Sequence, residues 1–72
     1  MVYRNELGQV HRVDGPAIIL TNGDKFWYVN DLRHRTDGPA VQWADGYCEW
    51  WVDGRRMTDF EVWVITGAKE HV

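Results

Sequence analysis

The stretch His11-Arg-Val-Asp-Gly-Pro-Ala17 returns with one change as His34-Arg-Thr-Asp-Gly-Pro-Ala40, and the two copies begin 23 residues apart. At the same offset, further positions carry identical or similar residues: Gly23 and Gly46, Trp27 and Trp50, Val29 and Val52, Asn30 and Asp53. A constant period of this length indicates stacked copies of one supersecondary unit. The repeated stretch therefore decides the architecture of the chain.

Each 23-residue unit is too short for two helices with their loops, and it divides into short apolar runs between turn residues. Asn22-Gly23 and Asp45-Gly46 are typical of two-residue hairpin turns, while Asn30-Asp31 and Asp53-Gly54 indicate further turns. We expect strands at 10–13, 17–20, 25–29, 32–36, 40–43, 47–52 and 55–57. Residues 6–12 resemble a fragment of the same unit, with Gly8 in the turn. The sequence predicts a mainly β fold, an antiparallel meander of tandem 23-residue β-hairpin repeats.

The repeat stops near Met57, and the pattern that follows is helical. Thr58-Asp59-Phe60-Glu61 fits a capping box at a helix start. Phe60, Trp63 and Val64 then share the spacing of one helix face. We expect a short C-terminal helix that caps the open end of the sheet. The predicted organisation is a single domain over 1–72, with repeats at 6–57, a capping helix at 58–67 and a loose tail at 68–72.

Composition limits the classes of function. The chain has 72 residues, five tryptophans and a formal net charge of −3. A negative charge argues against nucleic acid and anionic membranes as partners. No apolar run is long enough to span a membrane, and the first ten residues lack the apolar core of a signal peptide. With one cysteine and three scattered histidines, we expect no internal disulfide, no metal site and no cofactor in a cytoplasmic protein.

The repeated pattern HR-x-DGPA, followed by a spaced glycine and tryptophan and then by an NG-type turn, resembles a MORN-like tandem repeat. Similar repeats occur in small, mostly uncharacterised phage proteins and their bacterial relatives. The resemblance rests on His11–Ala17, Gly23, Trp27 and Asn30, and on their counterparts His34–Ala40, Gly46, Trp50 and Asp53-Gly54. It implies a binding or scaffolding surface in the host cytoplasm and no particular chemistry.

The repeated polar residues have two interpretations. His11 with Asp14, and His34 with Asp37, could act as acid–base pairs beside a nucleophile such as Cys48. However, a residue set that recurs once per unit is better explained as a means of building the unit. Asp would accept turn hydrogen bonds, Gly would supply an unusual φ, and His and Arg would bridge to the next hairpin. We therefore assign a structural role to His11, Arg12, Asp14, Gly15, Pro16, His34, Arg35, Asp37, Gly38 and Pro39, and we expect no catalytic residue.

Function in a repeat protein should appear where the units differ. In the second unit a Leu becomes Trp43, a Phe becomes Glu49, and Leu-Arg becomes Arg55-Arg56. Tryptophan and arginine are typical of binding hot spots. The predicted binding residues are Trp43, Glu49, Trp51, Arg55 and Arg56, and the alternative is that these positions have drifted on the surface. Trp27 and Trp50 are expected to form a stacked core, and Cys48 a half-buried apolar position.

The sequence is compatible with two functions. The first is a non-enzymatic module of phage type that binds and occludes a host protein, as a counter-defence inhibitor would, with homodimerisation through a sheet edge or face. The second is sequestration of a small ligand or nucleotide between subunits, with tryptophan and arginine side chains gripping a base and phosphates. Convergence of these side chains in one pocket would distinguish the two.

Overall fold

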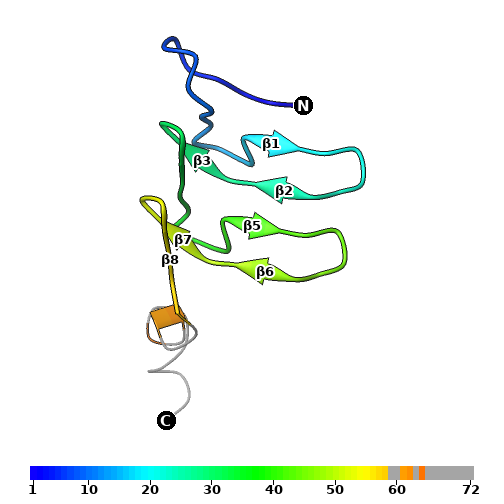
Figure 1. The fold of residues 1–72 in the computed structure, drawn as a ribbon, viewed down its shortest axis with the longest axis vertical. Coiled ribbons are helices and arrows are strands. Elements are labelled where there is room, and N and C mark those ends of the chain that lie inside the picture. The colour runs from blue at the N-terminus through cyan, green and yellow to red at the C-terminus, as the bar shows by residue number, and fades with distance from the viewer. Residues whose placement is uncertain (59–60, 63, 65–72) are drawn as a thin grey trace.

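The computed structural model describes residues 1–58, 61–62 and 64 of the chain. This part of the molecule is mainly β and consists of short antiparallel strand pairs (Figure 1). The strands are β1 (Ile18–Ile19), β2 (Lys25–Phe26), β3 (Tyr28–Val29), β4 (Leu32–Arg33), β5 (Val41–Gln42), β6 (Cys48–Glu49), β7 (Trp51–Val52) and β8 (Arg55–Arg56). Each of β5 to β8 begins 23 residues after its counterpart among β1 to β4.

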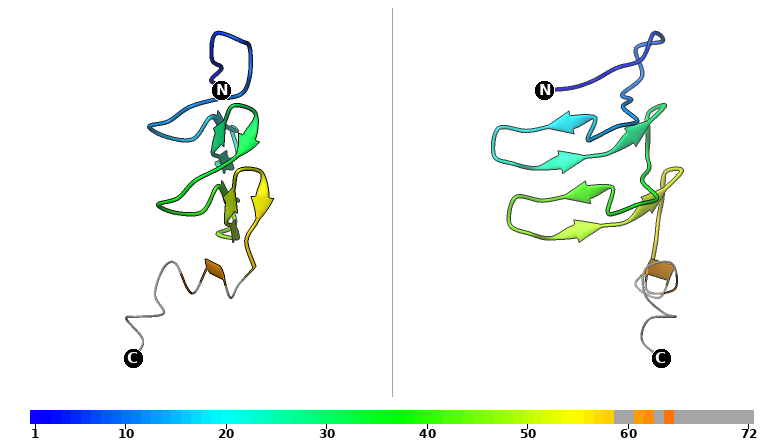
Figure 2. Two further views of the ribbon diagram at one scale, coloured as in Figure 1. Left: turned by 90° about the vertical axis from the view of Figure 1, so that its left-hand side faces the viewer. Right: turned by 180° about the vertical axis from the view of Figure 1, so that it is seen from behind.

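The strands form one sheet and two separate hairpins. The four-stranded sheet has the order β1-β2-β5-β6, and every neighbouring pair in it is antiparallel. The pairs β3–β4 and β7–β8 each form a two-stranded sheet of their own. In Figures 1 and 2 the four-stranded sheet extends to one side, and the two hairpins stand one above the other along its opposite side. The strands therefore do not run as one continuous meander.

Trp27 divides the single strand that the sequence predicts over 25–29. Its N–H donates to the carbonyl of Ala40 at 2.7 Å, whereas its carbonyl accepts from the N–H of His34 at 3.1 Å. The first bond holds the chain in the large sheet and the second directs it into the β3–β4 hairpin. Trp50 is the corresponding residue of the second unit, and its carbonyl accepts from the N–H of Met57 at 2.8 Å. Both tryptophans thus mark the point where the chain leaves the sheet.

The N-terminal segment contains a partial copy of this arrangement, centred on Tyr3. The Tyr3 N–H donates to the carbonyl of Ala17 at 2.8 Å, and its carbonyl accepts from His11 at 3.0 Å. These are the bonds that Trp27 makes one unit later. No strand forms over 10–13, where Val10 makes only an isolated bridge with Arg4. The N-terminal residues therefore cover the outer edge of β1 without forming a complete unit.

The turns within the large sheet differ from the expected two-residue type. Gly23 donates to the carbonyl of Leu20 at 3.0 Å and has a φ of +99°. The Gly46 N–H donates to the carbonyl of Trp43 at 2.9 Å, and Gly46 has a φ of +97°. Asn22 keeps a negative φ, because a three-residue loop needs the left-handed conformation only at its last residue.

The turns of the two short hairpins are two-residue turns. Asn30 and Asp31 both have positive φ values, of 51° and 67°, and Asp53 and Gly54 have 50° and 80°. Two consecutive left-handed residues define the type I′ turn, whose twist matches the flanking strands. Asn, Asp and Gly tolerate this conformation best, so the positions predicted as turns from the sequence are confirmed.

The core is small, and the repeated motif supplies half of it. Ala17 and Ala40, the last residues of the two motif copies, are fully buried, and so is Val41. Phe26 completes the buried apolar set among the described residues. Trp27 and Trp50, which we expected to form the core, are only half-buried. They lie outside it because the chain turns out of the sheet at both residues.

Most of the predicted capping helix lies outside the described residues, as does the tail at 68–72. The residues expected at the start of this helix include Thr58 and Glu61, which the structure describes. The Glu61 N–H donates to the Thr58 hydroxyl at 3.2 Å, and the Thr58 N–H donates to the Glu61 carboxylate at 3.1 Å. These reciprocal bonds are those of a capping box.

Candidate functional site

Arg12 organises the first motif loop, residues 12–16. Its Nε donates to the Asp14 carboxylate at 2.9 Å, and its Nη1 donates to the carbonyl of Pro16 at 3.3 Å. Its guanidinium also stacks on the ring of Tyr3, with 4.1 Å from Cζ to the ring centre. One side chain thus closes its own loop and joins that loop to the preceding segment.

Arg35 repeats this arrangement in the second motif loop, residues 35–39. Its Nε donates to Asp37 at 2.9 Å, its Nη1 donates to the Pro39 carbonyl at 3.1 Å, and it stacks on Trp27 at 4.1 Å. The hydrogen bond and charge of the arginine lower the pKa of Asp37, and Arg12 acts in the same way on Asp14. Both carboxylates are consequently ionised at neutral pH.

The motif glycines are required for space, not for an unusual φ. Neither Gly15 nor Gly38 has a positive φ, which corrects the conformational role expected from the sequence. A Cβ on Gly38 would lie 2.7 Å from Cζ of Arg35, and one on Gly15 would lie 3.1 Å from Cζ of Arg12. The arginine therefore packs directly against the glycine backbone of its own loop.

The motif histidines join each loop to the next hairpin turn. His11 Nδ1 accepts the N–H of Asn30 at 3.1 Å, and His34 Nδ1 accepts the N–H of Asp53 at 3.0 Å. The imidazoles therefore bind turn amides, while the aspartates of the motif bind arginines. This geometry agrees with a bridging role for the histidines and differs from the acid–base pairing that a catalytic interpretation requires.

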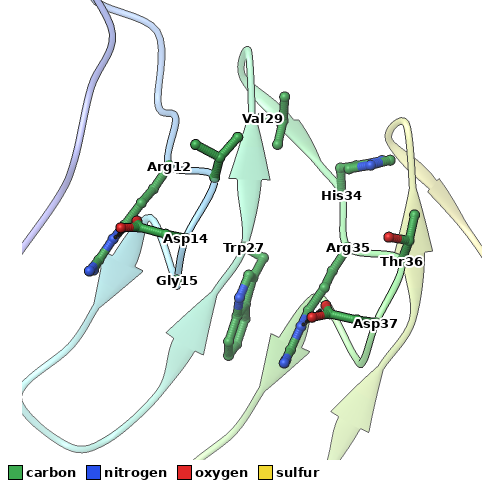
Figure 3. Close-up of a pocket in the computed structure, with 10 residues that line it drawn as sticks. Arg12, Asp14, Gly15, Trp27, Val29, His34, Arg35, Thr36 and Asp37 are labelled. Carbon is green, nitrogen blue, oxygen red and sulfur yellow. Dashed lines mark hydrogen bonds and ion pairs between the residues drawn. The ribbon is translucent and has the colours of Figure 1, made fainter.

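A groove of about 680 Å³ lies between the two motif loops. Figure 3 shows Trp27 between the Arg12–Asp14 pair and the Arg35–Asp37 pair. The volume of the groove is within the range of small-ligand sites. The lining residues are Arg12, Val13, Asp14, Gly15, Trp27, Val29, His34, Arg35, Thr36 and Asp37.

Arg33 is the centre of a second candidate surface, on the large sheet and the two hairpins. Its Cζ lies 5.0 Å from the ring centre of Trp51 and 5.9 Å from those of Phe26 and Tyr28. Its Nε donates to the Tyr28 hydroxyl at 3.0 Å. Arginine placed beside several rings combines cation–π attraction with a polar contact point.

Two of the predicted binding residues extend this cluster. Trp43 packs edge-on against Phe26 with ring centres 5.4 Å apart. The Glu49 carboxylate accepts the indole N–H of Trp51 at 2.9 Å. We call this connected surface the aromatic face and define it as Phe26, Tyr28, Arg33, Trp43, Glu49 and Trp51.

The predicted arginines Arg55 and Arg56 are both exposed. Arg56 is opposite Trp51 in the β7–β8 ladder, and its Nη2 donates to the Tyr47 hydroxyl at 2.8 Å. Arg55 instead pairs with the Glu61 carboxylate. The structure therefore brings together Trp43, Glu49 and Trp51, with Arg56 adjacent, and it places Arg55 apart.

Glu61 provides a prediction for the pH dependence of this end of the molecule. Hydrogen bonds from Arg55 and from the Thr58 backbone lower the pKa of Glu61 from 4.5 to about 2. Because the folded-state pKa is depressed, the stability from this group is present above 4.5 and lost as the pH falls towards 2. We expect Arg55→Ala to raise the Glu61 pKa towards 4.5 in a carboxyl-carbon NMR titration. An unchanged pKa would show that Arg55 is not the main partner of Glu61.

The predicted binding residues did not include Arg33, Phe26 or Tyr28, which the structure places in the aromatic face. The signal was nevertheless available, because a two-residue turn at 30–31 pairs Tyr28 with Arg33 across the hairpin. Cys48, expected to be half-buried, is exposed, and its Sγ lies 3.6 Å from the Gly46 carbonyl. It belongs to the face of the sheet opposite Glu49, since adjacent strand residues alternate.

Within the part of the chain that the structure describes, no three potential metal-ligating side chains come together. No helix found among these residues is long and apolar enough to cross a membrane. Comparison of the whole chain with family models, curated proteins and solved structures gave no match.

Proposed function

We propose that the protein is a non-enzymatic module that binds another protein through its aromatic face. The observation that carries the proposal is the position of half-buried Arg33 beside the half-buried rings of Tyr28 and Trp51 and above the buried ring of Phe26. Arginine, tryptophan and tyrosine are the residues that contribute most to protein–protein binding energy. The aromatic face concentrates these residue types, whereas the motif side chains are engaged in holding the units together.

The exposure of the rings also favours a protein partner. Trp43 is 37% exposed, and Tyr28 and Trp51 are half-buried. A small protein that leaves such rings in contact with water can gain by covering them in a complex. Half-buried rings are also held in position before binding, which reduces the entropy lost on association.

The resemblance to repeats of small phage proteins favours a host protein as the partner. Such a module would act by covering a surface of its target inside the host cell, since the proposal gives it no chemistry of its own. We therefore propose inhibition of a host enzyme or immune effector by occlusion as the biological role.

Affinity capture with matched variants tests this function. The wild-type protein, Trp43→Ala, Trp51→Ala and the control Leu7→Ala would be used as baits in host lysate, after circular dichroism confirms folding. Leu7 is 82% exposed in the N-terminal turn and is not part of the aromatic face. We expect a protein retained by wild type and Leu7→Ala and reduced about tenfold or more by the tryptophan variants. Equal capture by all four baits would contradict the proposal.

Native mass spectrometry of gently purified protein addresses the alternative. The protein-binding proposal predicts a bare monomer or dimer. A co-purified small molecule with the mass of a nucleotide would contradict it and would favour sequestration of a ligand.

A further inference from the structure

We propose that the groove between the two motif loops is a binding site for a guanidinium group, presented by an arginine side chain of a partner. This site is separate from the aromatic face, so the proposal does not depend on what that face binds. It rests on the position of Trp27, on the exposure of two carboxylates, and on the lower exposure of the arginines that line the groove.

Trp27 provides a flat surface for stacking inside the groove. One side of its indole is covered by the Arg35 guanidinium at 4.1 Å. Figure 3 shows the ring between the two arginine–aspartate pairs, so its other side faces Arg12 and Asp14 across the groove. Arg12 itself stacks on Tyr3. A planar group can therefore enter beside the indole from solvent.

The most exposed charges of the groove are negative. The side chains of Asp14 and Asp37 are 82% and 83% exposed, whereas those of Arg12 and Arg35 are 27% and 22% exposed. A cation approaching the mouth of the groove meets the carboxylates first, and the chain as a whole carries a net charge of −3. This asymmetry favours a cationic ligand over an anionic one.

The arginines of the groove are held by contacts within the protein, which leaves them less available to an anion than the exposed carboxylates are to a cation. Arg12 and Arg35 each bind an aspartate, a proline carbonyl and an aromatic ring. Each aspartate accepts its arginine through Oδ1, and Oδ2 accepts no hydrogen bond from the described residues. A second guanidinium could bind that oxygen while it stacks on Trp27.

The chemistry of the site selects arginine over lysine. A guanidinium is planar, stacks on aromatic rings and forms directed hydrogen bonds with carboxylates, whereas an ammonium group is a compact, strongly hydrated point charge. The protein already uses this combination once in the groove, where Arg35 contacts both Trp27 and Asp37. The proposed ligand would repeat it on the free side of the ring.

The proposal is tested by NMR titration of the full chain with N-acetyl-L-arginine amide. The neutral isostere N-acetyl-L-citrulline amide and inorganic phosphate serve as comparison probes. The indole N–H signal of Trp27 is identified by its loss in Trp27→Phe. We expect the arginine amide to shift this signal saturably in the millimolar range, with a much smaller effect of the citrulline amide and of phosphate.

A double variant tests the charge of the carboxylates without removing the acceptors that hold the two loops. Asp14→Asn with Asp37→Asn keeps an oxygen that can accept from each arginine but removes both charges. We expect it to weaken arginine binding about fivefold, whereas Asp45→Asn, in a turn outside the groove, leaves binding unchanged. Equal binding of arginine and citrulline, a stronger response to phosphate, or no shift of the Trp27 signal would each overturn the proposal. None of these results bears on capture by the aromatic face.

Discussion

Replacing Phe26 by alanine is expected to lower the free energy of unfolding by about 3–5 kcal/mol. Phe26 is the largest of the four buried apolar side chains in the described part of the chain, and it contacts Trp43 and Arg33. It pairs with strands on both sides, opposite Ile18 in β1 and Val41 in β5. Its removal would leave a cavity where the two units meet. A domain of this size has only a few kcal/mol of stability, so we expect much of the variant to be unfolded.

Urea denaturation followed by far-UV circular dichroism measures this effect. The control is Leu7→Ala, at a highly exposed position, which we expect to change the unfolding free energy by less than about 0.5 kcal/mol. If Phe26→Ala were as stable as this control, the core would have to lie elsewhere.

Replacing Gly38 by alanine is expected to destabilise the fold by about 2–3 kcal/mol. The new Cβ would lie 2.7 Å from Cζ of Arg35, closer than a real contact allows. The Arg35 side chain cannot move away freely, because it is held by Asp37, by the Pro39 carbonyl and by Trp27. The alanine must therefore break part of this network. The measurement is the same urea titration.

Two variants make this prediction specific. Gly15→Ala places a Cβ 3.1 Å from the corresponding atom of Arg12, so we expect a smaller loss, of about 1 kcal/mol. In the background of Arg35→Ala the Gly38→Ala change should cost much less, because the clashing side chain is absent. Equal, additive costs in both backgrounds would mean that the glycine is required for another reason.

The parts of the fold that depend on neighbouring residues were predictable from the sequence. The turn at Asn30-Asp31 follows from the tolerance of these residues for positive φ, and the observed values of 51° and 67° agree. The division of the strand at Trp27 was not predictable. It arises from hydrogen bonds of Trp27 with Ala40 and His34, which lie outside the segment, and residues 25–29 alone have the pattern of one continuous strand.

The same distinction applies to the candidate surfaces. Trp43, Glu49 and Trp51 were selected because the units differ there, and comparison of the units needs no knowledge of packing. The central position of Arg33 depends on how the hairpin folds against the large sheet. The groove was also not predicted, because it lies between two loops that are brought together by contacts between the units, among them the stacking of Arg35 on Trp27.

The central claim is that the repeated motif builds the fold, and the unfolding free energy of Arg35→Lys tests it most directly. Lysine keeps the charge but loses the planar stacking on Trp27 and the directed bonds to Asp37 and Pro39. We predict a loss of at least about 1.5 kcal/mol, against little change for Arg56→Lys, whose arginine is exposed and donates to one hydroxyl. Wild-type stability in Arg35→Lys would contradict the account, because the repetition of the motif in both units would then need an explanation other than a role in folding.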